Sequence, residues 1–153
     1  MRAHLIVCYI DGLCEPAYEG GPQNPGGIAT YGYVVLNGHK KAIARRFGII
    51  GEGPLMSNNV AEYAGLCRCL RFLLKRDANL EDIEIKSDSK LVVNQMKGNW
   101  KVHGGLYTEK HLEAKRLSQR FKNLSFTWIP RELNEEADAL SRKAYESAFR
   151  SRI

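Results

Sequence analysis

The first apolar run of the chain constrains its fold more than any other feature: Leu5-Ile6-Val7-Cys8-Tyr9-Ile10. This run is short, rich in β-branched residues and apolar on both faces, which predicts a central strand covered on both sides. Asp11 and Gly12 follow it directly, and the apolar pattern ends there. We therefore expect a carboxylate at the carboxyl end of a core strand.

The next segment predicts a loop and then a hairpin. Residues 12–27 hold five Gly and three Pro, which is typical of an irregular loop. Residues 28–36 and 41–50 flank Asn37-Gly38, a dipeptide that favours a tight hairpin turn because both central positions need φ > 0. We expect three strands in succession, of which the last two are antiparallel.

Helices and strands alternate in the rest of the chain. Ser57 or Asn58 can cap a helix that runs to about Lys75. The elements expected after it are a strand at 83–86, a short helix through Met96, a helix at 105–122, a strand at 124–130 and a helix at 134–149. This order predicts an α/β fold with a five-stranded mixed sheet flanked by helices. The first three strands of the sheet are antiparallel and the later ones are parallel.

Length and composition set the broad class of the protein. With 153 residues, 44% apolar and 26% charged, the chain is expected to form a single domain over residues 1–153. No run approaches 18 apolar residues and Asp11 comes too early for a signal peptide, so we expect a cytoplasmic monomer without membrane contact. The four cysteines are too sparse for a disulfide scaffold and form no CxxC pair, so we expect buried neutral thiols. The net charge of +6 permits a polyanionic partner without naming one.

Four acidic residues stand apart from the others by their position: Asp11, Glu62, Asp88 and Asp138. Glu62 lies four residues before Leu66, which places it on the core-facing side of the first helix, in its first turn, where an unpaired carboxylate is costly. Asp11 and Asp88 each follow a predicted strand, and they emerge at the same sheet edge if these strands are parallel neighbours. Asp138 comes early in the last helix.

Four carboxylates gathered at one edge would repel one another, and two divalent cations would relieve that repulsion. Oxygen ligands without His or Cys select Mg²⁺ or Mn²⁺ over Zn²⁺. Acidic two-metal sites are typical of phosphoryl transfer. Ordinary interpretations stay open for three of the acids, namely a turn at Asp11-Gly12, a helix cap at Asp88 and a solvated acid at Asp138.

The sequence resembles the type 1 ribonuclease H family, in its cellular form without the basic protrusion. The matching motifs, in the family's order, are Tyr9-Ile10-Asp11-Gly12 with Cys14, Asn24-Pro25-Gly26-Gly27, Ser57-Asn58-Asn59-Val60-Ala61-Glu62-Tyr63, Asp88-Ser89 with Gln95-Met96, and Trp128-Ile129-Pro130-Arg131 before Asn134-Glu135-Glu136-Ala137-Asp138. The resemblance implies a ribonuclease H-like fold and hydrolysis of the RNA strand of RNA–DNA hybrids, leaving 5′-phosphate and 3′-hydroxyl ends.

The resemblance also implies roles for individual residues. Asp11 would bridge two Mg²⁺ or Mn²⁺ ions, Asp138 would hold the ion that activates water, and Glu62 and Asp88 would hold the other. The residues implied to line the RNA strand are Gly12, Cys14, Asn24, Asn58 and Asn59. Helix capping is the alternative interpretation of the two last asparagines.

The chain departs from the family pattern at three places. Many relatives carry a His before the last catalytic aspartate, whereas residues 128–138 contain none. Arg131 is the candidate substitute for this His. The alternative is that Arg131 is a surface arginine paired with Glu132 or Glu135. Residues 99–105 leave no room for the protrusion helix, although Trp100, Lys101 and His103 could contact the DNA strand. The alternative for Trp100 is a partly buried core residue. Lys90 stands where many relatives have Gln, and residues 17–23 lengthen the loop beside Asp11.

Three functional hypotheses follow. The first is a metal-dependent endoribonuclease that acts on RNA–DNA hybrids. The second is a broadened ribonuclease that also cleaves double-stranded RNA, suggested by the altered substrate loops. The third is a non-catalytic nucleic-acid-binding domain on the same fold, which would be expected to have lost at least one of the four carboxylates.

Overall fold

The computed structural model describes residues 5–16 and 27–150. Five strands form one mixed sheet in the order β3-β2-β1-β4-β5. The strands are β1 (Leu5–Glu15), β2 (Gly27–Leu36), β3 (Ala42–Gly53), β4 (Asp82–Ser87) and β5 (Asn123–Trp128). The helices are α1 (Asn58–Lys75), α2 (Lys90–Met96), α3 (Thr108–Ser118) and α4 (Glu135–Arg150), with a 3-10 turn at Arg131–Leu133. The predicted fold class and order of elements are confirmed.

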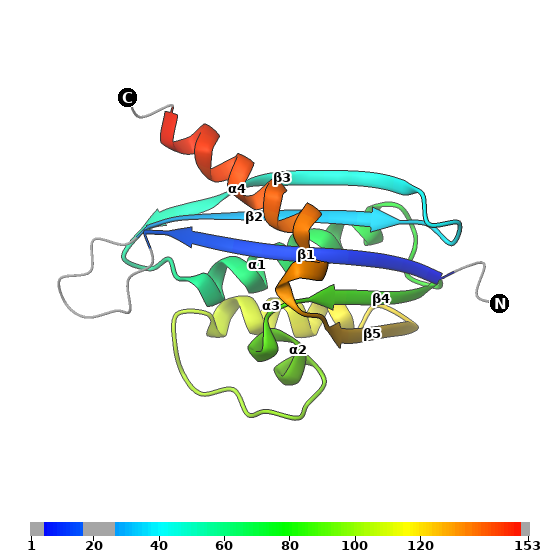
Figure 1. Cartoon of the computed structure of the whole chain (residues 1–153). Helices are drawn as coiled ribbons and strands as arrows, with labels where there is room; N and C mark the ends of the chain where they lie inside the picture. The colour runs from blue at the N-terminus through cyan, green and yellow to red at the C-terminus, as the bar shows by residue number, and fades with distance from the viewer. Residues whose placement is uncertain (1–4, 17–26, 151–153) are drawn as a thin grey trace.

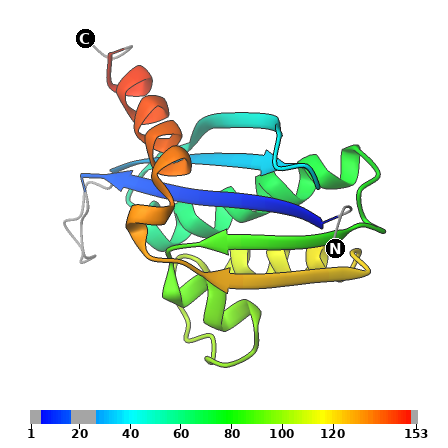
Figure 2. The ribbon, with the colours of Figure 1, turned by 45° about the vertical axis from the view of Figure 1, so that its right-hand side comes forward.

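The sheet changes from antiparallel to parallel at β1. β1 pairs with β2 antiparallel and with β4 parallel, and β4 pairs with β5 parallel. The three parallel strands therefore end at the same edge of the sheet, as their arrowheads show in Figure 2. In an α/β sheet this is the edge at which functional groups gather.

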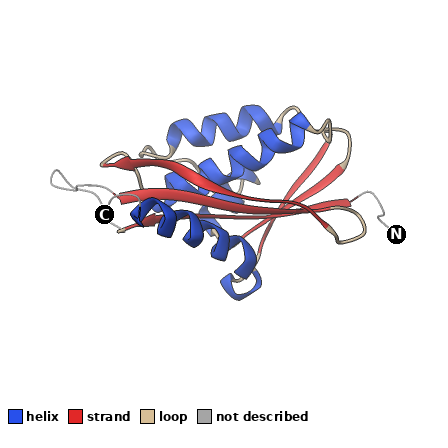
Figure 3. Ribbon diagram, turned by 90° about the horizontal axis from the view of Figure 1, so that it is seen from above, coloured by secondary structure: helices blue, strands red, loops and turns tan. Residues whose placement is uncertain are grey.

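Helices cover both faces of the sheet (Figures 1 and 3). α1 packs on β1 and β2 with α3 against it, whereas α4 lies on the opposite face and packs on β1, β2 and β3. The buried stripe of α1 includes Leu66, Leu70 and Leu73, as its 3.6-residue period predicts. It meets Cys8 and Ile10 of β1 in one core cluster.

The hairpin between β2 and β3 differs from the predicted tight turn. The Asn37 N–H donates to the Lys41 carbonyl, so three residues form the loop, and of residues 37–41 only Lys40 has a positive φ, at 62°. The Asn37 carboxamide oxygen accepts from the N–H groups of His39 and Lys41. Because the asparagine side chain closes the loop, Asn37 and Gly38 need no left-handed backbone.

The largest further differences from the predicted element boundaries are in β1 and α3. β1 continues through Asp11 and Gly12 to Glu15, because its later residues pair with the start of β2. α3 is shorter than the expected 105–122 and covers Thr108–Ser118. Within the described residues, no helix is both long and apolar enough to cross a bilayer.

Candidate active site

Three carboxylates meet at the edge where the parallel strands end. One side-chain oxygen each of Asp11, Glu62 and Asp88 lie within 4.8 Å of one another. They come from β1, from α1 and from the turn after β4. Asp138 of α4 lines the same concave surface, together with Gly12, Leu13, Glu15, Asn58, Arg131 and Arg142.

Strand register and one glycine explain this convergence. Ile10 pairs with Ser87 in the parallel ladder, so Asp11 and Asp88 each follow a paired residue and emerge side by side. Gly12 lies directly against α1, where a Cβ atom would come 2.3 Å from the backbone carbon of Ala61. Only glycine lets the helix approach the strand this closely, and the approach brings Glu62 to Asp11. Gly12 therefore lies beside the acids, and its contact with the RNA strand stays a prediction.

Asp11 is the most buried acid of the described site, with 5% of its surface exposed. Ser141 of α4 donates its hydroxyl proton to Asp11 Oδ2 over 2.8 Å. Burial raises the pKa of Asp11 from 3.8 to about 7; the Ser141 hydrogen bond opposes this rise, and the charges of Asp88 and Asp138 add to it. In the absence of a cation, Asp11 is therefore partly protonated near neutral pH.

Glu62 lies in the second turn of α1, not the first, because the helix begins at Asn58. Its Oε2 is buried and accepts no hydrogen bond from the described residues. Burial, followed by the charges of Asp11 and Asp88, raises the pKa of Glu62 well above its usual value. Burial also raises the pKa of Asp88, although Arg131 opposes that rise.

This cluster fits a divalent cation. A buried carboxylate oxygen without a donor, close to two more carboxylates, is unfavourable unless the site binds positive charge. All three side chains offer hard oxygen ligands of the kind that Mg²⁺ and Mn²⁺ prefer. Three of the four acids that the sequence singled out as metal ligands, Asp11, Glu62 and Asp88, thus have a geometry compatible with that role.

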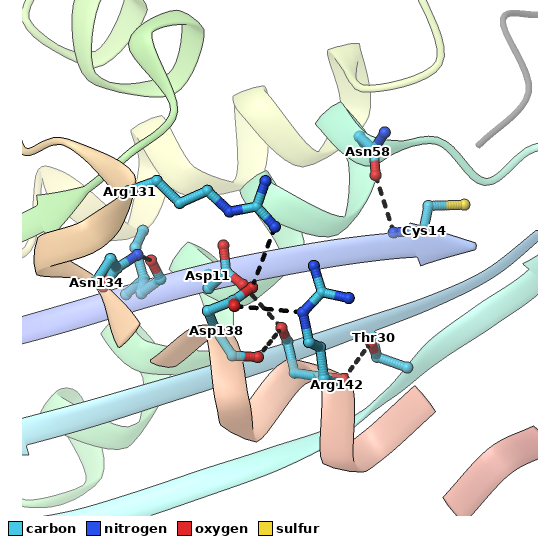
Figure 4. Close-up of polar contacts among 10 residues, drawn as sticks. Asp11, Cys14, Thr30, Asn58, Arg131, Asn134, Asp138 and Arg142 are labelled. Atoms are coloured by element: carbon cyan, nitrogen blue, oxygen red, sulfur yellow. Dashed lines mark hydrogen bonds and ion pairs between the residues drawn. The ribbon is translucent and has the colours of Figure 1, made fainter. Parts of the chain in front are cut away.

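Asp138 is held differently from the other three acids. Arg131 approaches its Oδ1 to 3.9 Å, and Arg142 donates from Nε to its Oδ2 over 3.3 Å (Figure 4). Asp138 is not part of the group within 4.8 Å found among the described residues. Arg131 therefore pairs with the fourth acid, and the alternative pairing with Glu132 or Glu135 is not among the ion pairs of the described residues.

Sequence reasoning missed Arg142 and the role of Asn134. Arg142 lies four residues after Asp138 on α4, a spacing that places two side chains on one helix face and could have indicated the pair. Asn134 is 1% exposed and donates from Nδ2 to the Ile10 carbonyl over 2.8 Å, which joins the start of α4 to β1 (Figure 4). Its sequence position alone did not indicate that contact.

The predicted RNA-strand residues lie in part beside the acids. Asn58 does not cap α1, because Ser57 Oγ accepts the N–H of Val60; the Asn58 carboxamide oxygen accepts the N–H of Cys14 over 3.0 Å instead. The capping interpretation of Asn58 is therefore wrong. Asn59 is exposed at the start of α1, and Asn24 lies outside the described residues. The Cys14 side chain is buried, and all four cysteines are free and buried as predicted.

Trp100 and Lys101 lie in the segment between α2 and α3, apart from the acids. Trp100 is 47% exposed, so its interpretation as a core residue is wrong. Lys101 is exposed too, and the described segment contains no additional helix, as predicted. Lys90 places its ammonium group 5.0 Å from the ring centroid of Trp128, whose Nε1–H donates to the Asp88 carbonyl.

Comparison with known proteins identifies the family. The family model described as reverse transcriptase-like matches residues 18–144. Ribonuclease HI of Halobacterium salinarum is 33% identical over 147 residues, covering 96% of this chain and 67% of that protein. The bifunctional protein Rv2228c of Mycobacterium tuberculosis is 36% identical over 134 residues, which cover 87% of this chain and 35% of that protein. The chain thus spans about a third of the length of some curated relatives.

Solved structures agree with this assignment. The N-terminal RNase H domain of Rv2228c superposes with a TM-score of 0.80 at 32% identity, covering 98% of this chain and 99% of that chain. LC11-RNase H1, solved in complex with an RNA/DNA hybrid, gives a TM-score of 0.78 at 32% identity, covering 94% of this chain and 99% of that chain. With its motifs, sheet order and acid cluster in place, the chain belongs to the type 1 ribonuclease H family.

Proposed function

We propose that this protein is an endoribonuclease that hydrolyses the RNA strand of RNA–DNA hybrids and leaves 5′-phosphate and 3′-hydroxyl ends. The observation that carries the proposal is the convergence of three carboxylates from three separate elements within 4.8 Å. LC11-RNase H1, a relative at 32% identity, was solved with an RNA/DNA hybrid, which supports the same substrate class here. A non-catalytic binding domain would have no need of a buried, unpartnered Glu62 oxygen.

The acids divide between two metal positions in this proposal. Asp11, Glu62 and Asp88 would hold one ion, and Asp11 with Asp138 would hold the other. Bound Mg²⁺ or Mn²⁺ supplies activation of the attacking water and stabilisation of the leaving oxygen. The assignment of these ions as Mg²⁺ or Mn²⁺ rests on the oxygen-only ligand set, which disfavours Zn²⁺.

Other residues of the site orient the acids and bind the substrate backbone. Ser141 donates to Asp11 Oδ2 and so orients the carboxylate that lies beside Glu62 and Asp88. Arg131 and Arg142 keep Asp138 at the rim, and both guanidinium groups can also contact a phosphate of the scissile strand. Arg131 cannot move a proton near neutral pH, so its role in this proposal is electrostatic.

Strand choice would depend on the two sides of the acid cluster. Backbone groups at Gly12, the amide nitrogen of Asn58 and the exposed amide of Asn59 would contact the strand that carries 2′-hydroxyls. Trp100 and Lys101 are exposed and would contact the DNA strand by stacking and by phosphate pairing. Monomeric state and cytoplasmic location stay predictions from the sequence.

Digestion of matched duplexes tests the proposal. The substrates are one labelled RNA strand paired with DNA or with RNA, and the corresponding DNA duplex, each with Mg²⁺ and with Mn²⁺. We expect cleavage of the RNA strand in the hybrid and none of the DNA duplex. Cleavage of the RNA duplex would support the broadened specificity, whereas hybrid binding without cleavage in either metal would favour the non-catalytic alternative.

A further inference from the structure

A buried hydrogen-bonded network joins α1, α2 and α3 behind the acid cluster. The hydroxyl of Tyr63, which is fully buried, donates to Gln95 Oε1 over 2.6 Å. Nδ1 of His111 lies 3.0 Å from the same hydroxyl and donates to it, because the single hydroxyl proton of Tyr63 is already given to Gln95. Gln95 and His111 are 3% and 7% exposed. Burial of this many polar groups is tolerated only because they satisfy one another.

The same network holds the backbone of the segment between α2 and α3, residues 97–107 (Figure 1). Gln95 Nε2 donates to the Lys101 carbonyl over 3.1 Å and to the Tyr107 hydroxyl over 3.1 Å. The Tyr107 hydroxyl in turn donates to the His103 carbonyl over 3.0 Å. Tyr107 also stacks on Tyr63, with ring centroids 5.7 Å apart. The network thus donates hydrogen bonds to the backbone carbonyls of Lys101 and His103, which lie in a segment without helix or strand.

Most side chains of this segment are exposed, and its composition suits a polyanion. Trp100, Lys101 and His103 are exposed, and residues 97–107 contain no Asp or Glu. The beginning of the segment is fixed as well, because the Asn94 carbonyl accepts the N–H groups of Asn99 and Trp100. An aromatic ring and cationic groups on a fixed backbone form a prepared surface for a nucleic-acid strand.

One turn of α1 connects this surface to the acid cluster. Glu62 and Tyr63 are consecutive, and consecutive side chains on a helix point about 100° apart. Glu62 faces Asp11 and Asp88, whereas Tyr63 faces α2 and α3. We propose that Tyr63 and Gln95 are positioning residues that hold the 97–107 segment at a fixed distance from the acids, so that it binds the uncleaved DNA strand. This inference rests on the proposed function.

Loss of the Gln95 amide should weaken binding of the hybrid without changing the chemical step. Without the Gln95 amide, the 97–107 segment loses its link to Tyr63 and must be ordered when the hybrid binds. The cost of ordering a few side chains corresponds to a rise in KM of about tenfold. The acids are not touched by the change, so kcat should stay within about twofold of the wild-type value.

Kinetics of the Gln95→Leu variant test this inference. We expect a higher KM for the hybrid, an unchanged kcat and faster hydrogen exchange at the amides of residues 99–106. The Leu117→Ala variant is the matched control, because Leu117 is buried in α3 and its apolar side chain takes no part in the hydrogen-bonded network. It should lose stability while keeping the wild-type KM. The Tyr107→Phe variant, which removes one hydroxyl only, should show a smaller rise in KM and serves if Gln95→Leu does not fold.

The outcomes distinguish the inference from the proposed function. If the wild-type protein cleaves the hybrid but neither Gln95→Leu nor Tyr107→Phe raises KM, the positioning role is wrong. An equal rise in KM in Leu117→Ala, or a fall in kcat at constant KM, would also contradict it. If the wild-type protein neither binds nor cleaves the hybrid, the proposed function itself fails, and this inference with it.

Discussion

Replacing Asp11 by asparagine should stabilise the metal-free protein at neutral and alkaline pH. The folded protein raises the pKa of Asp11 from 3.8 to about 7, chiefly by burying the carboxyl group. The folded state therefore binds this proton more tightly than the unfolded chain. The resulting stabilisation is complete below about pH 4 and is lost as the pH rises through about 7. The neutral amide of the Asp11→Asn variant carries no such pH dependence.

The pKa shift of Asp11 sets the size of the stability difference between the variant and the wild type. It spans roughly 3 pH units, and each unit is worth about 1.4 kcal/mol, so ionising Asp11 in the fold costs about 4 kcal/mol. The asparagine oxygen can still accept the Ser141 hydrogen bond. We therefore expect the Asp11→Asn variant to equal the wild type within about 1 kcal/mol near pH 4 and to exceed it by about 4 kcal/mol near pH 8.

Urea unfolding in EDTA at a series of pH values measures this difference. Asp138→Asn is the matched control, because it removes an acid of the same concave surface that is already paired with Arg131 and Arg142. Its gain in stability at pH 8 should be far below 4 kcal/mol, because the loss of both arginine pairs offsets the relief of its repulsion with Asp11. A constant difference between Asp11→Asn and wild type across the pH series, or a less stable variant at pH 8, would refute the reasoning.

Three further predictions concern the metal, Glu62 and Gly12. Mg²⁺ or Mn²⁺ at a hundredfold excess over its Kd should stabilise the wild type by about 2.7 kcal/mol in thermal unfolding, and no stabilisation would contradict the metal site. Glu62→Gln should lower the rate of hybrid cleavage by at least about 100-fold, because it removes a metal ligand, and should raise metal-free stability, because it removes a buried charge. Cleavage near the wild-type rate would disprove the role of Glu62. Gly12→Ala should cost at least about 2 kcal/mol, since its Cβ would lie 2.3 Å from the Ala61 backbone, whereas Gly104→Ala meets open space and should be neutral in the same unfolding assay.

The parts of the site that depend on regular periodicity could be predicted from the sequence. Asp11 follows a run that is apolar on both faces, and Glu62 keeps the register of Leu66, so a strand end and a helix face were enough to single them out. The parallel pairing of β1 with β4 then brings Asp88 to the same edge. These positions follow from local patterns and one rule of sheet topology.

Other parts depend on tertiary contacts that have no local signal. The link of Asn134 to Ile10 spans 124 positions, and the link of Tyr63 to Gln95 spans 32, so neither shows in a local pattern. The hairpin differs from the predicted turn because the Asn37 side chain satisfies the loop N–H groups itself. Trp100 is exposed because its segment is fixed by backbone contacts and not by burial of its ring.

Strand-specific cleavage of an RNA–DNA hybrid tests the central claim most directly, namely that the carboxylates of β1, β4 and α1 form a metal-dependent nuclease site. The measurement is the rate of RNA-strand cleavage with Mg²⁺ or Mn²⁺, with analysis of the product ends, for wild type and for the folded Asp11→Asn variant. We predict wild-type products with 5′-phosphate and 3′-hydroxyl ends, and loss of cleavage by the variant and in EDTA. Undiminished cleavage by Asp11→Asn, or by the wild type in EDTA, would contradict the account.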